Sequence, residues 1–326
     1  MAFARAIVAA YTRYGKNPGT VLKLAQITPA QLQRREGRIT AAQMETLSAA
    51  AMQELDDEGL GAFSRRLPWG SYGMLARASL SSPDLGVALK RWCRHHGLIA
   101  DDIALRLAVA GSVASIIIEE ARDLGAAREF CLVHVLRNIH GYGCWLIDSR
   151  IPLQGALFPF GAPPHADAYP LLFPGLLRFG AAQAVIQFDA RYLSLPLRRD
   201  EKALRLMLRR ALPLTVLQYR RDRLLVEQVR QAMAANPAQS HNAHDLAQLL
   251  NLSPRTLHRQ LKEEGASLQQ LKDEVRFELA KQLLYRTDKP IKQVATAAGF
   301  GNEKSFARAF RDWSGTPPTQ FRRGVT

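Results

Sequence analysis

The C-terminal third of this sequence contains one short pattern twice. In each copy a small residue is followed four positions later by Asn or Gly, residue types that readily adopt a positive φ and end a helix. Two large apolar residues spaced four apart then follow, as on the buried face of a second helix. The pattern predicts two closely crossing helices joined by a tight turn. The matched positions are Ala247, Asn251, Leu257 and Leu261 in the first copy and Ala295, Gly299, Phe306 and Phe310 in the second.

The second helix of each copy is predicted to carry a polar outer face. In the first copy Ser253 and Pro254 supply an N-cap and a proline at the first helical position. Because the apolar pair faces the core, the polar residues around it point outward. This is typical of a helix-turn-helix, whose second helix enters the major groove of double-stranded DNA. The outward residues are Arg255, Thr256, His258, Arg259 and Lys262 in the first copy and Asn302, Glu303, Lys304, Ser305 and Arg308 in the second.

One long helix is predicted between the two copies. A helix of about 18 residues spans about 27 Å, which can hold two reading helices near the roughly 34 Å repeat of successive major-groove faces. We expect Thr287, Asp288 and Pro290 to cap the helix that follows, and the two helix-turn-helix motifs to occupy about 243–264 and 291–312. The apolar residues that recur in the long helix are Leu268, Leu271, Val275, Leu279 and Leu283.

The N-terminal two-thirds mixes helices and strands. Helical periodicity dominates to about residue 100, including 21–33 and 42–55, and then changes to period two around Ala110 and Gly111, which predicts a β-hairpin over 103–119. A helix over 124–147, strands within 151–160 and 183–189, and a short helix near 166–172 are expected next. The predicted fold class is therefore two domains: a mixed α/β domain over 1–200 and, after a linker at 201–221, an all-α domain over 222–326.

The linker region is predicted to contain a basic helix with one apolar stripe, interrupted at Pro213. Such a stripe must be buried, either on the N-terminal domain itself or on a second copy of the chain. We favour the second copy, and so a homodimer. The stripe consists of Leu204, Met207, Leu208, Ala211 and Leu212.

Charge and composition suggest the partner and the compartment. The formal net charge of +15 indicates an anionic partner. There is no signal-peptide pattern and no apolar run near the roughly 20 residues of a membrane helix, so we expect no membrane association. The three cysteines lack CxxC spacing, which argues against a disulfide scaffold and favours a cytoplasmic location.

Two groups of Cys and His raise an enzyme as an alternative. Histidines that are adjacent or six apart do not share a helix face, whereas metal-binding pairs usually lie three or four apart. No phosphate-binding Gly-rich loop or nucleophile motif accompanies them. We therefore predict no enzyme activity, no metal and no cofactor, and keep as alternatives an enzyme and a nucleoid-type, non-specific DNA binder. The two groups are Cys93, His95 and His96, and His134, His140 and Cys144.

The N-terminal domain also suits a small-molecule effector. Amphipathic aromatic residues near glycines can line a pocket, and a histidine or arginine can orient the ligand. These residue types do not specify which effector binds. The candidate ligand-binding residues are Trp69, Tyr72, Arg137, His140 and Trp145.

Residues 222–326 resemble the DNA-binding domain of the AraC/XylS family of bacterial transcription regulators. The resemblance rests on "DLAQLLNLSPRTLHRQLKEEG", "RFELAKQLL" and "IKQVATAAGFGNEKSFARAFRDWSGTPPTQFRR". It implies a DNA-binding regulator, activation as the usual output, and RNA polymerase as a further candidate partner. The base-contacting positions of the family fall on Arg255, His258, Arg259, Glu303, Lys304 and Arg308. Phosphate contacts or helix caps are then expected of Ser253, Thr256, Lys262, Asn302 and Ser305.

Residues 20–200 resemble the arabinose-binding-like effector domain found in one subgroup of that family. The likeness lies in "LPWGSYGMLARASLSSPDLGVALK" and "PPHADAYPLLFPGLLRFGAAQAVIQFD". It implies a signal-sensing domain and dimerisation through the N-terminal region, without fixing the ligand.

Overall fold

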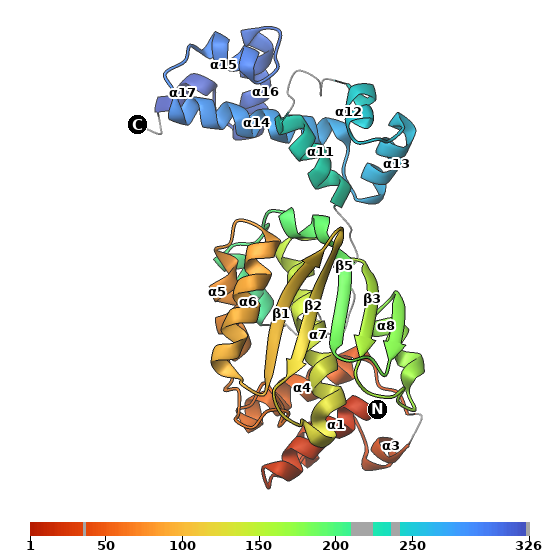
Figure 1. Cartoon of the computed structure of the whole chain (residues 1–326). Helices are drawn as coiled ribbons and strands as arrows, with labels where there is room; N and C mark the ends of the chain where they lie inside the picture. Colours follow the sequence, from red (N-terminus) through yellow and green to blue (C-terminus); the bar gives the residue numbers. More distant parts are fainter. Residues whose placement is uncertain (35–36, 210–223, 236–241, 324–326) are drawn as a thin grey trace. The chain divides into compact units, whose positions relative to one another are not determined.

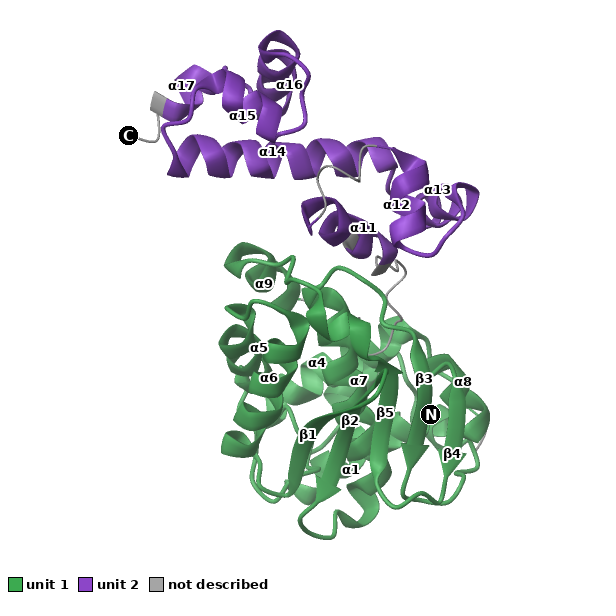
Figure 2. Cartoon of the chain, turned by 45° about the horizontal axis from the view of Figure 1, so that its top comes forward, with its two compact units in different colours: residues 1–221 green, residues 222–326 purple. Residues whose placement is uncertain are grey.

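The structure, a computed structural model, describes residues 1–34, 37–209, 224–235 and 242–323. The chain divides into two compact units, Met1–Arg221 and Asp222–Thr326, which Figure 2 shows in different colours. The first unit mixes a sheet with helices and the second is helical, so the predicted fold class is confirmed.

A five-stranded sheet lies at the centre of the first unit (Figure 1). The predicted hairpin is present, with β1 and β2 antiparallel from Ile103↔Glu120 to Ala110↔Val113. β5 lies between β2 and β3 and is antiparallel to both, and β4 joins the edge parallel to β3. The four-residue β4 was not predicted, because it depends on pairing with a strand distant in sequence. The strands are β1 (Ile103–Ala110), β2 (Val113–Glu120), β3 (Leu153–Phe158), β4 (Leu176–Phe179) and β5 (Ala184–Asp189).

One face of this sheet is covered by helices. Alternate residues of β2 and β5, such as Ile116 and Ile186, are buried, which is the period-two pattern of a half-buried strand. α7 (Arg128–Leu146) passes behind the sheet in Figure 1, and most of its residues are buried. α6 (Leu85–Ile99) packs on β1, α7 and α5 (Ser71–Leu80), and the short α8 (Tyr169–Leu172) precedes β4.

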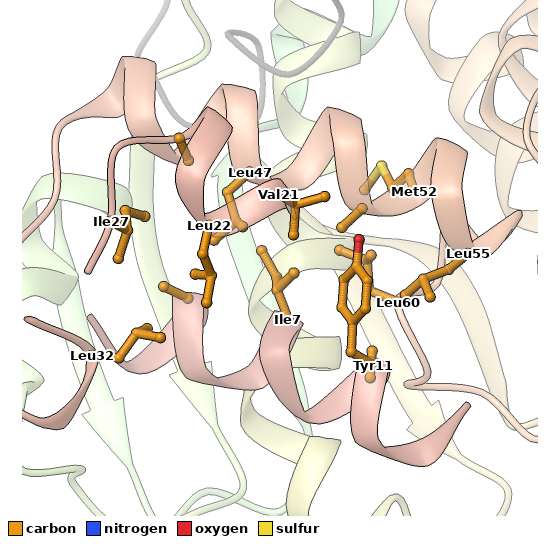
Figure 3. Close-up of a cluster of buried hydrophobic side chains, with 14 of the residues drawn as sticks. Ile7, Tyr11, Val21, Leu22, Ile27, Leu32, Leu47, Met52, Leu55 and Leu60 are labelled. Carbon is orange, nitrogen blue, oxygen red and sulfur yellow. The ribbon is translucent and has the colours of Figure 1, made fainter. Parts of the chain in front are cut away.

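The N-terminal helices form a cluster of buried hydrophobic side chains (Figure 3). Ile7 and Tyr11 of α1 (Ala2–Arg13) share this cluster with Leu47 and Leu55 of α4 (Ala41–Leu55), and the Tyr11 hydroxyl donates to Glu54 at 3.0 Å. The single helical stretch predicted over 21–33 is wrong. It is split into α2 (Gly19–Leu24) and α3 (Pro29–Gln33), because Gln26 takes a φ of 55° and Thr28 starts a new helix with a capping box.

α9 (Glu201–Leu208) corrects the dimer interpretation of the apolar stripe. Its residues Leu204 and Met207 are buried, and the methyl groups of Leu208 lie against Gly73 of α5. An ion pair of 3.0 Å between Arg77 and Glu201 joins the same two helices. The described part of the stripe is therefore covered by its own unit, because α5 presents a glycine at the contact and lets α9 approach closely. Ala211, Leu212 and the predicted interruption at Pro213 lie outside the described residues.

The second unit consists of helices that form two separate cores. The first core joins α11, α12, α13 and the start of α14, and the second joins the end of α14 to α15, α16 and the segment around Phe321. The helices are α11 (Leu224–Ala235), α12 (Ala243–Leu249), α13 (Pro254–Glu263), α14 (Leu268–Arg286), α15 (Ile291–Ala297), α16 (Glu303–Ser314) and α17 (Pro318–Arg323).

α14 is the predicted long helix, but it is not buried along one stripe. Leu268 and Leu271 enter the first core, whereas Ala280 and Leu284 enter the second. Its middle therefore bridges two bundles, as the purple unit of Figure 2 shows. The predicted capping of the next helix by Thr287 and Asp288 is wrong. The Thr287 hydroxyl instead donates back to the Leu283 carbonyl at 2.6 Å, and Pro290 is the N-cap of α15 without a side-chain hydrogen bond.

Candidate functional sites

The turns of the two helix-turn-helix motifs begin with the same backbone geometry, although the second turn, 298–302, is one residue longer than the first, 250–253. Asn251 has a φ of 53° and Gly299 a φ of 80°, so both adopt the predicted left-handed conformation. In each copy the next residue donates its backbone N–H to the carbonyl of the buried alanine, from Leu252 to Ala247 at 2.8 Å and from Phe300 to Ala295 at 2.9 Å. This shared hydrogen bond gives the two copies the same turn at the end of the first helix.

The first candidate reading helix is α13. Ser253 caps it by accepting a hydrogen bond from the Thr256 backbone at 3.1 Å, and Pro254 follows at its first position. Leu257 and Leu261 are buried, so the opposite face is available to a partner. Of the predicted residues on α13, Arg255, His258, Arg259 and Lys262 are exposed, whereas Thr256 is half-buried and its hydroxyl lies 2.8 Å from that of Ser253.

The second candidate reading helix is α16. Asn302 caps it by accepting from the Ser305 backbone at 2.8 Å, and Phe306 and Phe310 are buried. Three of the predicted residues, Glu303, Lys304 and Arg308, are exposed together with Asn302, and Ser305 is half-buried. The second helix of each motif thus presents a polar face with residues of mixed charge. Ser253 and Asn302 act in this structure as helix caps.

The N-terminal unit contains a cavity of about 50 Å³ bounded by α5, α6, α7 and the 58–67 segment. Of the predicted ligand-binding residues, Tyr72 lines it. Its phenol stands 5.3 Å from the ring of Trp92, in an edge-to-face arrangement. The other lining residues come from three stretches of the chain, 58–75, 92–99 and 130–138, which no single sequence window joins. They include Glu58, Phe63, Trp92 and His96.

The other predicted ligand residues lie elsewhere in the unit. Trp69 is 48% exposed at the surface. Arg137 is buried in α7 and donates to the Leu172 carbonyl at 2.9 Å, and one of its nitrogens lies 3.3 Å from Nδ1 of His140. Trp145 is buried beneath the guanidinium of Arg199, 5.4 Å from the ring centre. None of these four side chains lines the described cavity.

The Cys and His groups lack the features of an activated nucleophile or a metal site. Burial raises the pKa of Cys93 and Cys144 to about 12, whereas a reactive thiol needs a lowered value. Burial, helped by Arg137, lowers the pKa of His140 to about 3, and its Nε2 is engaged by the Ile151 carbonyl at 2.8 Å. Within 1–34, 37–209, 224–235 and 242–323, no group of three or more His, Cys, Asp or Glu side chains could hold a metal ion.

No helix in the described part of the chain is long and apolar enough to cross a bilayer.

Comparison with known proteins shows relatives along the whole chain. An ornithine utilization regulator of Pseudomonas aeruginosa is 27% identical over 325 residues, covering 99% of this chain and 95% of the relative. The transcriptional activator RhaS of Klebsiella pneumoniae is 38% identical over 84 residues, which cover 24% of this chain and 29% of RhaS. The crystal structure of the transcriptional regulator CdpR of Pseudomonas aeruginosa matches 94% of this chain and 96% of its own at 20% identity, with a TM-score of 0.35.

Two domain families match, one in each unit. The family described as the N-terminal arabinose-binding domain of AraC transcription regulators matches residues 15–197, and a helix-turn-helix domain family matches residues 246–324. These matches cover the sheet with its helices and both repeated motifs. Both of these relatives are transcription regulators. The chain therefore belongs to the AraC family of DNA-binding transcription regulators.

Proposed function

We propose that the protein reads two successive major-groove faces of one operator, using α13 and α16 as recognition helices. The observation that carries this proposal is the repetition of the same turn hydrogen bond, each time followed by a capped helix with an exposed polar face. α14 separates the two motifs by 19 residues, or about 28 Å of helix, which is close to the roughly 34 Å groove repeat.

The two faces favour sequence-specific over nucleoid-type binding. Phosphate contacts need only basic or small polar groups, whereas Glu303 would repel phosphates and suits the amino group of cytosine. The base-facing residues in this proposal are Arg255, His258, Arg259, Glu303, Lys304 and Arg308, and Lys262 is assigned to phosphate.

The two compact units suggest that sensing and DNA binding are carried out by different parts of the chain. We propose that residues 1–200 sense a small-molecule effector, that 201–221 link the domains and that 222–326 bind DNA. Activation through RNA polymerase is the proposed output, in keeping with the activator RhaS among the relatives. A homodimer remains part of the proposal through the family resemblance alone, because the described residues of the α9 stripe are covered by α5.

Replacing Arg259 or Arg308 by alanine is expected to weaken operator binding by about 1–3 kcal/mol, because each would lose a bidentate base contact. Both side chains are exposed on the outer faces of their helices. Arg259 pairs with Glu263 at 2.7 Å, but an exposed pair of this kind contributes little and can be exchanged for a base. Operators selected from genomic DNA would be titrated at fixed salt by fluorescence anisotropy.

The control for these two variants is Arg205→Ala. It removes the same charge from an exposed position on α9, in the other unit. It should leave operator affinity unchanged. If an arginine variant kept wild-type affinity and base preference, the assignment of that helix would be wrong.

Lys262→Ala should weaken binding to all DNA sequences alike. Lys262 lies late in α13, where a side chain meets the phosphate backbone more readily than base edges. The slope of log affinity against log salt should fall by about 1, the contribution of one neutralised phosphate. Operator and scrambled duplexes would be titrated over a salt series. A loss confined to the operator would contradict this role and make Lys262 a base-reading residue.

A further inference from the structure

We propose that the cavity between α5, α6 and α7 binds a small organic cation, a protonated alkyl amine, as the effector. This inference rests on the proposed function, in which the N-terminal unit is the sensor. Three independent features of the cavity wall support it: its charge, an unpartnered histidine and its aromatic rings.

The first feature is a carboxylate without a counter-charge. Glu58 lines the cavity, and its two oxygens accept hydrogen bonds from the backbone N–H groups of Gly70 at 2.8 Å and Tyr72 at 2.5 Å. A carboxylate has about four acceptor positions, so two remain. Within the described residues Glu58 forms no ion pair, and no lysine or arginine lines the cavity.

The groups around Glu58 change the pKa of its carboxyl group. Burial raises the pKa of Glu58, the two backbone hydrogen bonds lower it, and the neighbouring carboxylates of Asp57 and Asp56 raise it further. Asp57 is itself buried and bonded to the backbone of Gly59, Gly61 and Leu67 rather than to a cation. The pKa of Glu58 is raised overall, because burial disfavours its charged form, and a cation bound beside it would favour that charged form.

The second feature is His96. Its side chain lines the cavity and is 5% exposed, yet its Nδ1 has no hydrogen-bond partner among the described residues. Unpaired buried polar atoms are rare in folded proteins and call for an explanation. Burial lowers the pKa of His96 to about 4, so the ring is neutral at pH 7 and offers one acceptor nitrogen. A ligand N–H group would satisfy it without adding a like charge.

The third feature is the set of aromatic rings. Phe63, Tyr72 and Trp92 all line the cavity, and Phe63 also stands 6.0 Å from the ring of His96. Aromatic faces attract an ammonium group through the ring quadrupole, most strongly when water is excluded. They attract neutral ligands only through apolar contact.

The same wall disfavours a ligand that carries a carboxylate. An amino acid would bring its own negative charge toward Glu58, and none of the lining residues offers a positive charge to receive it. An unpaired charge that is taken out of water is strongly disfavoured. The cavity therefore selects an amine over the corresponding amino acid.

Titration calorimetry on the full-length protein tests this with three matched probes. They are 1-butylamine, the neutral isostere 1-butanol, and L-norvaline, which is the same amine with an α-carboxylate. We expect the amine to bind at least about tenfold more tightly than the other two, the ratio given by one charge-assisted hydrogen bond. Equal or tighter binding of 1-butanol or L-norvaline, or no binding by 1-butylamine, would overturn the inference.

Glu58→Gln provides the second arm. It keeps the size of the side chain and removes its charge, so 1-butylamine affinity should fall by about tenfold to hundredfold while 1-butanol affinity stays the same. The control is Asp101→Asn, an exposed carboxylate outside the cavity lining. Unchanged amine binding by Glu58→Gln would overturn the assignment. If this variant does not fold, the three-probe series on the wild type decides alone.

Operator binding by the same wild-type preparation separates this inference from the proposed function. A protein that binds its operator but no amine refutes the ligand assignment alone. A protein that binds 1-butylamine but shows no preference for any DNA sequence refutes the proposed function instead.

Discussion

Phe310→Ala is expected to destabilise the second core of the DNA-binding unit by about 3–5 kcal/mol, the usual cost of removing a buried phenylalanine. Phe310 is 0% exposed. Its ring lies 5.6 Å from Phe306, 5.4 Å from Phe277 and 5.3 Å from Phe321, so one side chain joins α16, α14 and α17. Because so large a share of a domain's net stability is removed, α16 should lose its fixed place and operator binding should fall with it.

Urea unfolding followed by tryptophan fluorescence would measure this loss, since Trp313 lies in the same core, 5.7 Å from Phe277. The matched control is Tyr285→Ala on α14, whose aromatic side chain is 68% exposed and should change stability by less than about 0.5 kcal/mol. A loss below about 1 kcal/mol for Phe310→Ala would mean that this core does not hold the second reading helix.

Leu204→Glu is expected to destabilise the N-terminal unit by at least about 3 kcal/mol, because it combines a lost apolar contact with a charge buried without a partner. Leu204 is 0% exposed on α9, which packs on α5. The same substitution at Leu206, two residues along the same helix and 68% exposed, should have an effect below about 0.5 kcal/mol.

Thermal unfolding of both variants, with sedimentation of the folded proteins, distinguishes burial of the stripe on α5 from burial on a second copy of the chain. Burial on α5 predicts a lower melting temperature for Leu204→Glu and no change for Leu206→Glu. A Leu204→Glu protein of wild-type stability that sediments as a smaller species would instead mean that a second copy of the chain covers this residue.

The sequence by itself determined most of the DNA-binding unit. Its structure depends on local signals: a capping Ser253 or Asn302, a left-handed Asn251 or Gly299, and apolar residues four apart. Each of these acts within a few residues, so it can be recognised in one window of sequence. The long helix between the motifs was also predicted. The division of its apolar residues between two separate cores was not predicted, because both cores contain the same kind of apolar residue from this helix.

The sensing unit was determined far less by its sequence. The hairpin of β1 and β2 has strong local periodicity and was predicted, as was the helix α7, whereas the edge strand β4 exists through its pairing with β3. The stripe on α9 was recognised as a surface that must be buried, yet only the fold decided that Gly73 of α5 would receive it.

The cavity is the clearest case of a feature that only tertiary structure decided. Glu58, Phe63, Tyr72 and Trp92 come from a loop and two helices, and none of them stands at a spacing that marks a site. Local rules fix backbone conformation and which face of a helix is apolar. Which polar side chains meet in an interior space depends on how helices and sheet pack together, and that is set by contacts between residues far apart in the chain.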